Sequence, residues 1–125
     1  MNPTPATPKL PIVLACSGCS RAGEIADRTA RRLQELGVAR MACLASVSAG
    51  IKATKDAIQA APERMMLDAC PLECGAKTLR LAGITEFQHF KLHELGVHKH
   101  HSEVSEETIQ ALAEAATIRL QPGQG

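Results

Sequence analysis

Three short apolar runs that each end in Ala-Cys constrain the fold more than any other feature of this sequence. They cover residues 10–16, 39–43 and 64–70, and their cysteines, Cys16, Cys43 and Cys70, are equally spaced along the chain. Short apolar runs of this kind are typical of buried strands. Apolar residues at helical spacing lie between the runs, so each interval has the length of one strand followed by one helix.

Residues that begin and end helices support this division. Ser20 and Ser105 are placed to act as N-caps. Gly37 and Gly83 each come just after a helical pattern, at the position where a residue with left-handed backbone conformation ends a helix. Pro62 ends the helical pattern that precedes it. The predicted strands cover residues 10–16, 40–47, 64–69 and 86–92, and the predicted helices cover residues 22–36, 51–58, 72–79 and 105–120.

The predicted order alternates strand and helix throughout, which indicates an α/β fold. We expect three layers, with a four-stranded, mainly parallel sheet and helices on both faces, of the Rossmann-like or flavodoxin-like kind. Both common strand orders, 2-1-3-4 and 3-2-1-4, keep the first three strands contiguous. One domain over residues 10–120 accounts for the pattern, with flexible tails at residues 1–9 and 121–125.

The composition fits one globular domain and argues against some functions. Of the 125 residues, 45% are hydrophobic and 22% are charged, a balance that lets the chain bury a core. The net charge of +1 does not favour binding to nucleic acid or to an anionic membrane surface. The sequence has no Trp or Tyr and only two Phe, which leaves little for base stacking.

The sequence also indicates a compartment, and this bears on its five cysteines. No apolar run approaches the ~20 residues of a membrane span, and the N-terminal segment lacks the apolar core of a secretory signal. We therefore expect a cytoplasmic protein, in which thiols stay reduced. Five cysteines in that setting indicate metal binding, catalysis or redox chemistry rather than structural disulfides.

The cysteines are expected to gather at one edge of the sheet. Ligands of open α/β sheets bind beyond the carboxyl ends of the strands, where Cys16, Cys43 and Cys70 all lie. Neighbouring strands are about 4.8 Å apart, and Cys74 lies one helical turn beyond Cys70. Thiolates from four cysteines at ~2.3 Å from one point form a tetrahedral zinc site. The sequence therefore predicts that these four bind one zinc ion, with iron or another thiophilic metal as an open alternative.

The same segments carry a family resemblance. The stretches CSGCSRAGEIADRTARRL, GVARMACLASV, LDACPLECGAKTL and FQHFKLHELGVHK resemble the DGC-domain family, whose members are proposed to bind zinc through cysteines. The resemblance spans roughly residues 10–100 and implies the same four ligands, with Cys19 as an accessory residue. Where the family's naming motif reads Asp-Gly-Cys, this chain reads Asp68-Ala69-Cys70, which leaves less room for the backbone to approach a metal.

Two other functions stay open. Cys16 and Cys19 form a Cys-x2-Cys pair directly before a helix, where thiolates are stabilised, so the chain could be a thiol-redox or sulfur-carrier protein. More remotely, the segment from Cys16 to Arg21 is similar to the phosphate loop of low-molecular-weight protein tyrosine phosphatases. The Cys-to-Arg spacing is one residue shorter here, however, and no Asp precedes a Pro. Because no general base or oxyanion-binding group is identifiable, the sequence does not predict an enzyme.

Residues near the cysteines are candidates for supporting roles. Asp68 could orient the loop that follows it through hydrogen bonds, or simply stabilise a turn, and Lys77 could help to neutralise the thiolates. After the last strand, His93, His98 and the two histidines that follow could add imidazole ligands at the same edge. A His-rich turn is more often simply solvated. The sequence does not indicate a protein partner.

Overall fold

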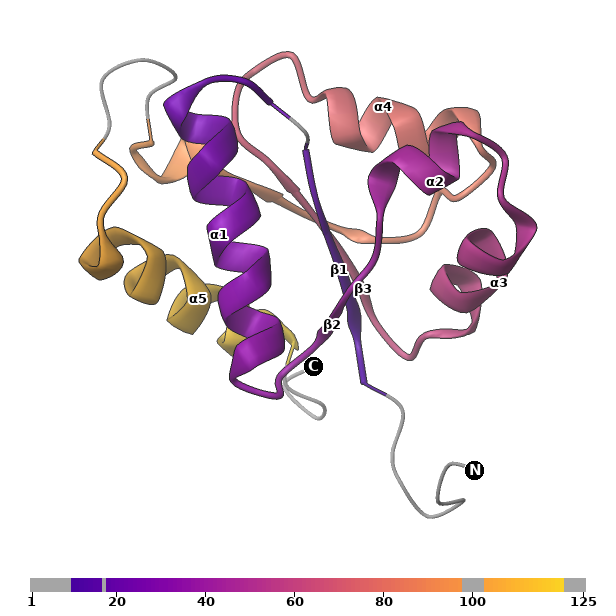
Figure 1. Cartoon of the computed structure of the whole chain (residues 1–125), viewed down its shortest axis with the longest axis horizontal. Coiled ribbons are helices and arrows are strands. Elements are labelled where there is room, and N and C mark those ends of the chain that lie inside the picture. The colour runs from indigo at the N-terminus through magenta and orange to yellow at the C-terminus, as the bar shows by residue number, and fades with distance from the viewer. Residues whose placement is uncertain (1–9, 17, 98–102, 121–125) are drawn as a thin grey trace.

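A parallel four-stranded sheet forms the centre of the molecule (Figure 1). The computed structural model describes residues 10–16, 18–97 and 103–120, and the predicted tails and His98 lie outside these ranges. The strand order is β2-β1-β3-β4, and every neighbouring pair is parallel. The predicted α/β class is confirmed, and the order is the first of the two that we expected.

Helices cover both faces of this sheet. The elements in chain order are β1 Ile12–Ala15, α1 Arg21–Glu35, β2 Arg40–Met41, α2 Leu44–Ser48, α3 Lys52–Ala60, β3 Arg64–Asp68, α4 Cys74–Leu81, β4 Gln88–Lys91, the short 3-10 helix η1 Leu92–Leu95, and α5 Glu106–Leu120. Helices α1 and α5 pack against each other on one face, while α2, α3 and α4 group on the other (Figure 1).

The two central strands are buried on both faces because helices cover each side. Val13 and Leu14 of β1 and Met65 and Met66 of β3 are fully buried, as expected for a parallel sheet between two layers of helices. The register pairs Ile12 with Arg64 and continues to Ala15 beside Leu67. The two strands therefore end side by side, and the residues that follow them start from the same edge.

The predicted caps are confirmed at the N-termini of α1 and α5 and at the C-terminus of α1. The Ser20 hydroxyl accepts a 3.2 Å hydrogen bond from the Gly23 N–H, and the Ser105 hydroxyl accepts one of 3.1 Å from the Thr108 N–H. Gly37, which follows α1, has a φ of +75°. These local signals could be read from the sequence because each cap depends on residues within one helical turn.

The second predicted strand, residues 40–47, is confirmed at residues 40–41 and wrong over residues 42–47. The strand β2 contains only Arg40 and Met41, and the following residues form the helix α2. At the edge of the sheet β2 has a single neighbour, so a longer strand would gain hydrogen bonds on one side only. The segment instead turns back and packs α2 against α4 and α3, which buries Val47. As a result Cys43 caps a short helix rather than ending a strand directly.

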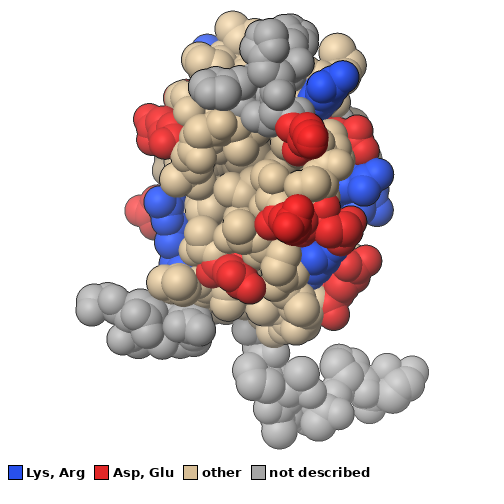
Figure 2. Space-filling model, turned by 90° about the vertical axis from the view of Figure 1, so that its left-hand side faces the viewer, with Lys and Arg blue, Asp and Glu red and all other residues tan. Residues whose placement is uncertain are grey.

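The surface mixes charges of both signs. Figure 2 shows the side of the molecule that carries α5, where acidic and basic side chains lie next to one another along the edges of a largely uncharged surface. Arg28 and Arg32 of α1 form ion pairs with Glu106 at the start of α5, which ties the two helices together. In the described part of the chain, no helix has the length and apolar character needed to cross a membrane.

Candidate cysteine site

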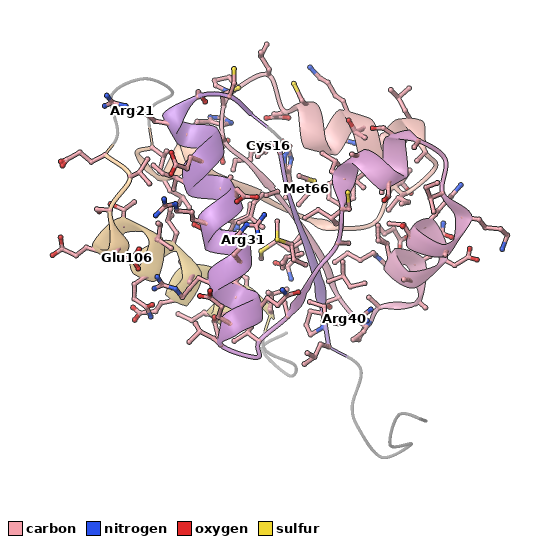
Figure 3. All side chains as sticks on the ribbon, viewed as in Figure 1. Cys16, Arg21, Arg31, Arg40, Met66 and Glu106 are labelled. Carbon is pink, nitrogen blue, oxygen red and sulfur yellow. The ribbon has the colours of Figure 1, made fainter. Side chains whose placement is uncertain are left out.

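Cys16 occupies the centre of the candidate site. It directly follows β1, which lies between β2 and β3, and its N–H donates a 2.9 Å hydrogen bond to the Leu67 carbonyl of β3. Figure 3 shows Cys16 at the carboxyl end of the sheet, with Arg40 at the opposite end. The residue is only 9% exposed. The carboxyl ends of the parallel strands therefore meet around this thiol, as the sequence predicts.

The surroundings of Cys16 favour its neutral form. Burial raises the pKa of the thiol, and the N–H groups of Ala69 and Gly18 offset this in part by hydrogen bonding. The negative charges of Asp68 and Cys70 raise the pKa further. Cys70 follows β3, the strand next to β1, so it lies at the same edge of the sheet as Cys16. A cation placed between the two thiols would reverse the effect, because it stabilises the thiolate.

Asp68 positions the segment that carries Cys70 and Cys74. Its carboxylate is buried and accepts hydrogen bonds from the N–H groups of Gly75 at 2.8 Å and Ala76 at 3.0 Å. The same carboxylate lies 2.7 Å from Nε2 of His89 on β4. Asp68 therefore satisfies the first free N–H groups of α4, a task that Glu73, at the N-cap position itself, does not perform.

The loop between Cys70 and Cys74 is also held from the side of β4. Glu73 adopts a left-handed backbone conformation with φ +54°, which is uncommon for a residue with a side chain. Its carboxylate lies 3.6 Å from Lys91 Nζ and 3.7 Å from His93 Nε2. Burial acts to raise the pKa of Glu73, but the charges of Lys91, His89 and His93 outweigh it and hold the pKa below its ordinary value. Charge pairing thus supports an unusual backbone conformation within the candidate site.

Cys43 has the opposite electrostatic character to Cys16. The polar groups of Ser46 and Ala45, in the first turn of α2, lower the pKa of this exposed thiol. Cys43 occupies the N-cap position of α2, but its side chain makes no capping hydrogen bond. Cys43 is thus a thiol that ionises more readily than an ordinary cysteine and that is accessible to reagents.

The comparison with known families covers the segment that carries all five cysteines. The family model of the DGC domain matches residues 12–116, which span all the elements that carry the cysteines. The chain belongs to the DGC-domain family. The anaerobic and virulence modulator AnvM of Pseudomonas aeruginosa is a relative, 33% identical over 94 residues that cover 75% of this chain and 72% of AnvM. No solved structure matches this DGC-domain protein.

The DGC-domain structure brings only some of the predicted residues together. Cys16 is buried and Cys70 is half-buried at the ends of neighbouring strands, whereas Cys19, Cys43 and Cys74 are exposed. Across residues 10–16, 18–97 and 103–120, no three side chains of His, Cys, Asp or Glu lie close enough to bind one metal ion. The four predicted ligands thus share an edge of the sheet and have the right donor atoms, but Cys43 and Cys74 are not gathered around Cys16.

The other predicted residues have simpler placements. Lys77 lies exposed on α4, and His93 faces Glu73 beside the loop that carries Cys70. Arg21 begins α1, and its side chain points away from Cys16 (Figure 3). A phosphate loop requires the guanidinium to fold back over the bound anion, so this arrangement argues against phosphatase chemistry.

Residues that the sequence did not single out complete the polar surroundings of the DGC site. They are Glu73, His89 and Lys91. The position of His89 next to Met66 in the sheet register could have suggested a partner for Asp68, but this requires knowledge of which strands are neighbours. The left-handed conformation of Glu73 has no signal in the sequence, because Glu is not a residue that favours it.

Replacing Ser46 with Ala should raise the pKa of Cys43 toward its ordinary value. The hydroxyl of Ser46 is the largest cause of the lowered pKa, so its loss leaves less thiolate at neutral pH. We expect alkylation of Cys43 by iodoacetamide, followed by peptide mass spectrometry, to become several times slower at pH 7 and to reach the wild-type rate at high pH. Ser48→Ala, on the same helix, is the matched control. Equal rates for S46A and the wild type at pH 7 would contradict this account of the thiol.

Proposed function

We propose that this DGC-domain protein binds zinc through Cys16, Cys43, Cys70 and Cys74. The observation that carries the proposal is the position of Cys16, Cys43 and Cys70 just after three adjacent parallel strands, at one edge of the sheet. Thiolate sulfur is the donor that zinc prefers in closed structural sites. A bound cation would also offset the burial and the negative charge that raise the pKa of Cys16.

The exposed thiols of Cys43 and Cys74 would have to move when zinc binds. Cys43 and Cys74 each stand at the start of a helix, α2 and α4, and would have to approach Cys16 and Cys70 for one ion to contact all four. Zinc bound in this way would stabilise the folded state, because the unfolded chain offers no such site. Since AnvM is named as a modulator, we infer a modulator role in which metal loading changes the surface near these helices.

A thiol-redox or sulfur-carrier role is the second candidate. The observation that favours it is the exposure of Cys19, Cys43 and Cys74, together with the lowered pKa of Cys43. Exposed thiols with a lowered pKa exchange disulfides readily near neutral pH. This role requires no metal, and the same residues would carry it.

Metal analysis of tag-free protein, purified without oxygen, separates the two candidates. We expect about one zinc ion per chain, and about four thiols that react with a disulfide reagent only after a chelator is added. Cys16→Ser and Cys70→Ser should lose most of the metal, whereas Cys19→Ser, the matched control, should keep it. Metal-free protein with freely reactive thiols would overturn the zinc proposal and favour the redox role.

A further inference from the structure

A groove on the α2, α3 and α4 side of the molecule lies apart from the cysteine edge. Its volume is about 570 Å3, which is in the range of small-ligand sites. The groove is formed where the carboxyl ends of α2 and α4 approach the first turn of α3, three helices that group together in Figure 1. None of the candidate cysteines lines it.

The walls of the groove expose apolar surface. Val47 and Ala82 line it, and two larger side chains, Ile51 and Leu81, stand at its rim with 48% and 90% of their surfaces exposed. Large apolar side chains so close together in contact with water are costly, and burial against an apolar ligand would remove that cost. The groove therefore offers a surface for an apolar chain.

The opposite side of the groove is positively charged. The first turn of α3 carries Lys52 and Lys55 and no acidic residue, and its N-cap residue Ile51 provides no side-chain hydrogen bond. Because Lys52 is paired with Asp56, the positive potential at this side comes mainly from Lys55 and from the amino end of the α3 dipole. Anions are stabilised at such a position, whereas cations in the first turn are unfavourable without one.

Lys55 is the group best placed to receive an anion. It is half-buried in the groove wall, and its Nζ lies over the backbone of Gly83, 3.7 Å from where a Cβ at that position would be. Lys52 is already paired with Asp56 at 2.7 Å, whereas no ion pair within the described residues includes Lys55. The position of Lys55 near the end of α4 is favourable for a cation, and it leaves the ammonium donors available to a ligand.

We propose that this groove binds a small organic anion in which an apolar chain ends in a single carboxylate. The carboxylate would pair with Lys55, and the apolar chain would cover Ile51, Leu81 and Ala82. Among the described residues, Lys55 is the groove cation without an ion pair, and one such cation beside an apolar wall matches one carboxylate better than a phosphate, which needs several donors. This proposal is independent of metal or redox chemistry at the cysteines.

Decanoate, below its micelle concentration, is the probe that tests this site. In a titration followed by amide NMR spectra, we expect shifts at Ser48, Gly50 and Gly83 around the groove and none at α5. Decyltrimethylammonium has the same chain and the opposite charge, so we expect no binding from it. Equal binding of the two amphiphiles, or shifts spread over the whole surface, would overturn the proposal.

Variants of the two sides of the groove complete the test. Lys55→Gln should weaken decanoate binding about tenfold, the loss expected for one charge-assisted hydrogen bond, and Lys55→Arg should restore most of it. Leu81→Ser should weaken binding several-fold through the lost apolar contact. The matched controls are Lys77→Gln, an exposed cation on α4 outside the groove, and Ile118→Ser, an exposed apolar residue on α5.

The controls should change decanoate affinity less than twofold. Unchanged affinity in Lys55→Gln would overturn the proposed role of the cation. An acidic, leucine-containing peptide that shifts the same amides while decanoate does not would assign the groove to a protein segment and overturn the small-ligand proposal.

Discussion

Asp68→Ala is expected to lower the free energy of unfolding by about 3 kcal/mol. The change removes a buried carboxylate that accepts hydrogen bonds from Gly75 and Ala76 and contacts His89. It leaves these donors buried without partners, and the start of α4 loses the negative charge that complements its dipole. Urea denaturation followed by circular dichroism measures the difference.

The control for this prediction is Asp56→Ala. Asp56 also pairs with a cation, Lys52, but both side chains are exposed, so its removal should cost less than about 1 kcal/mol. Asp68→Asn keeps the shape and one acceptor, and should fall between the two. If Asp68→Ala were as stable as Asp56→Ala, the carboxylate would not be holding α4 in place.

Gly23→Ala is expected to lower the free energy of unfolding by about 2 kcal/mol, although Ala is the better helix former. In a helix, Gly to Ala gains about 1 kcal/mol from intrinsic propensity. Here the added Cβ would lie 2.7 Å from both Cα and the carbonyl oxygen of Gly18, a contact with backbone that cannot rotate away. Such overpacking typically costs about 1–3 kcal/mol, and it also displaces the N–H that Ser20 caps.

The test is whether G23A is less or more stable than the wild type, because packing predicts a loss of stability and helix propensity predicts a gain. Thermal and urea unfolding of G23A against the wild type would measure it, with Gly37→Ala as the control. Gly37 has φ +75° and no atom within 4 Å of an added Cβ, so its cost of about 1 kcal/mol comes from the backbone alone. A stabilised G23A protein would mean that Gly18 does not pack closely against Gly23 of α1.

The contacts made by Gly18 and by Asp68 should also affect the neighbouring cysteines. Gly18 lies between Cys16 and Cys19, and Asp68 precedes Cys70. Displacing either segment should change the reactivity of the nearest thiols as well as stability. Measuring thiol reactivity in both variants therefore shows whether the packing around the sheet edge also controls the candidate site.

Much of the fold could be predicted from the sequence because its signals are local. Burial of β1 and β3 on both faces produces continuous apolar runs, and the caps at Ser20 and Ser105 need only residues within one turn. The second strand was mispredicted because its length depends on the number of neighbouring strands. A segment such as residues 44–48 has no strong preference of its own, so packing against α4 decided its conformation.

The sequence by itself determined the alternation of strands and helices, and with it the placement of Cys16, Cys43 and Cys70 at one edge of a parallel sheet. Only the tertiary structure decided that Cys16 is buried and Cys70 half-buried while Cys43 and Cys74 stay exposed. It also decided that Asp68 joins the start of α4 to His89 of β4. The physical reason is that periodicity reports which residues are buried, whereas the direction of a side chain beyond a strand depends on loop backbone and on distant partners.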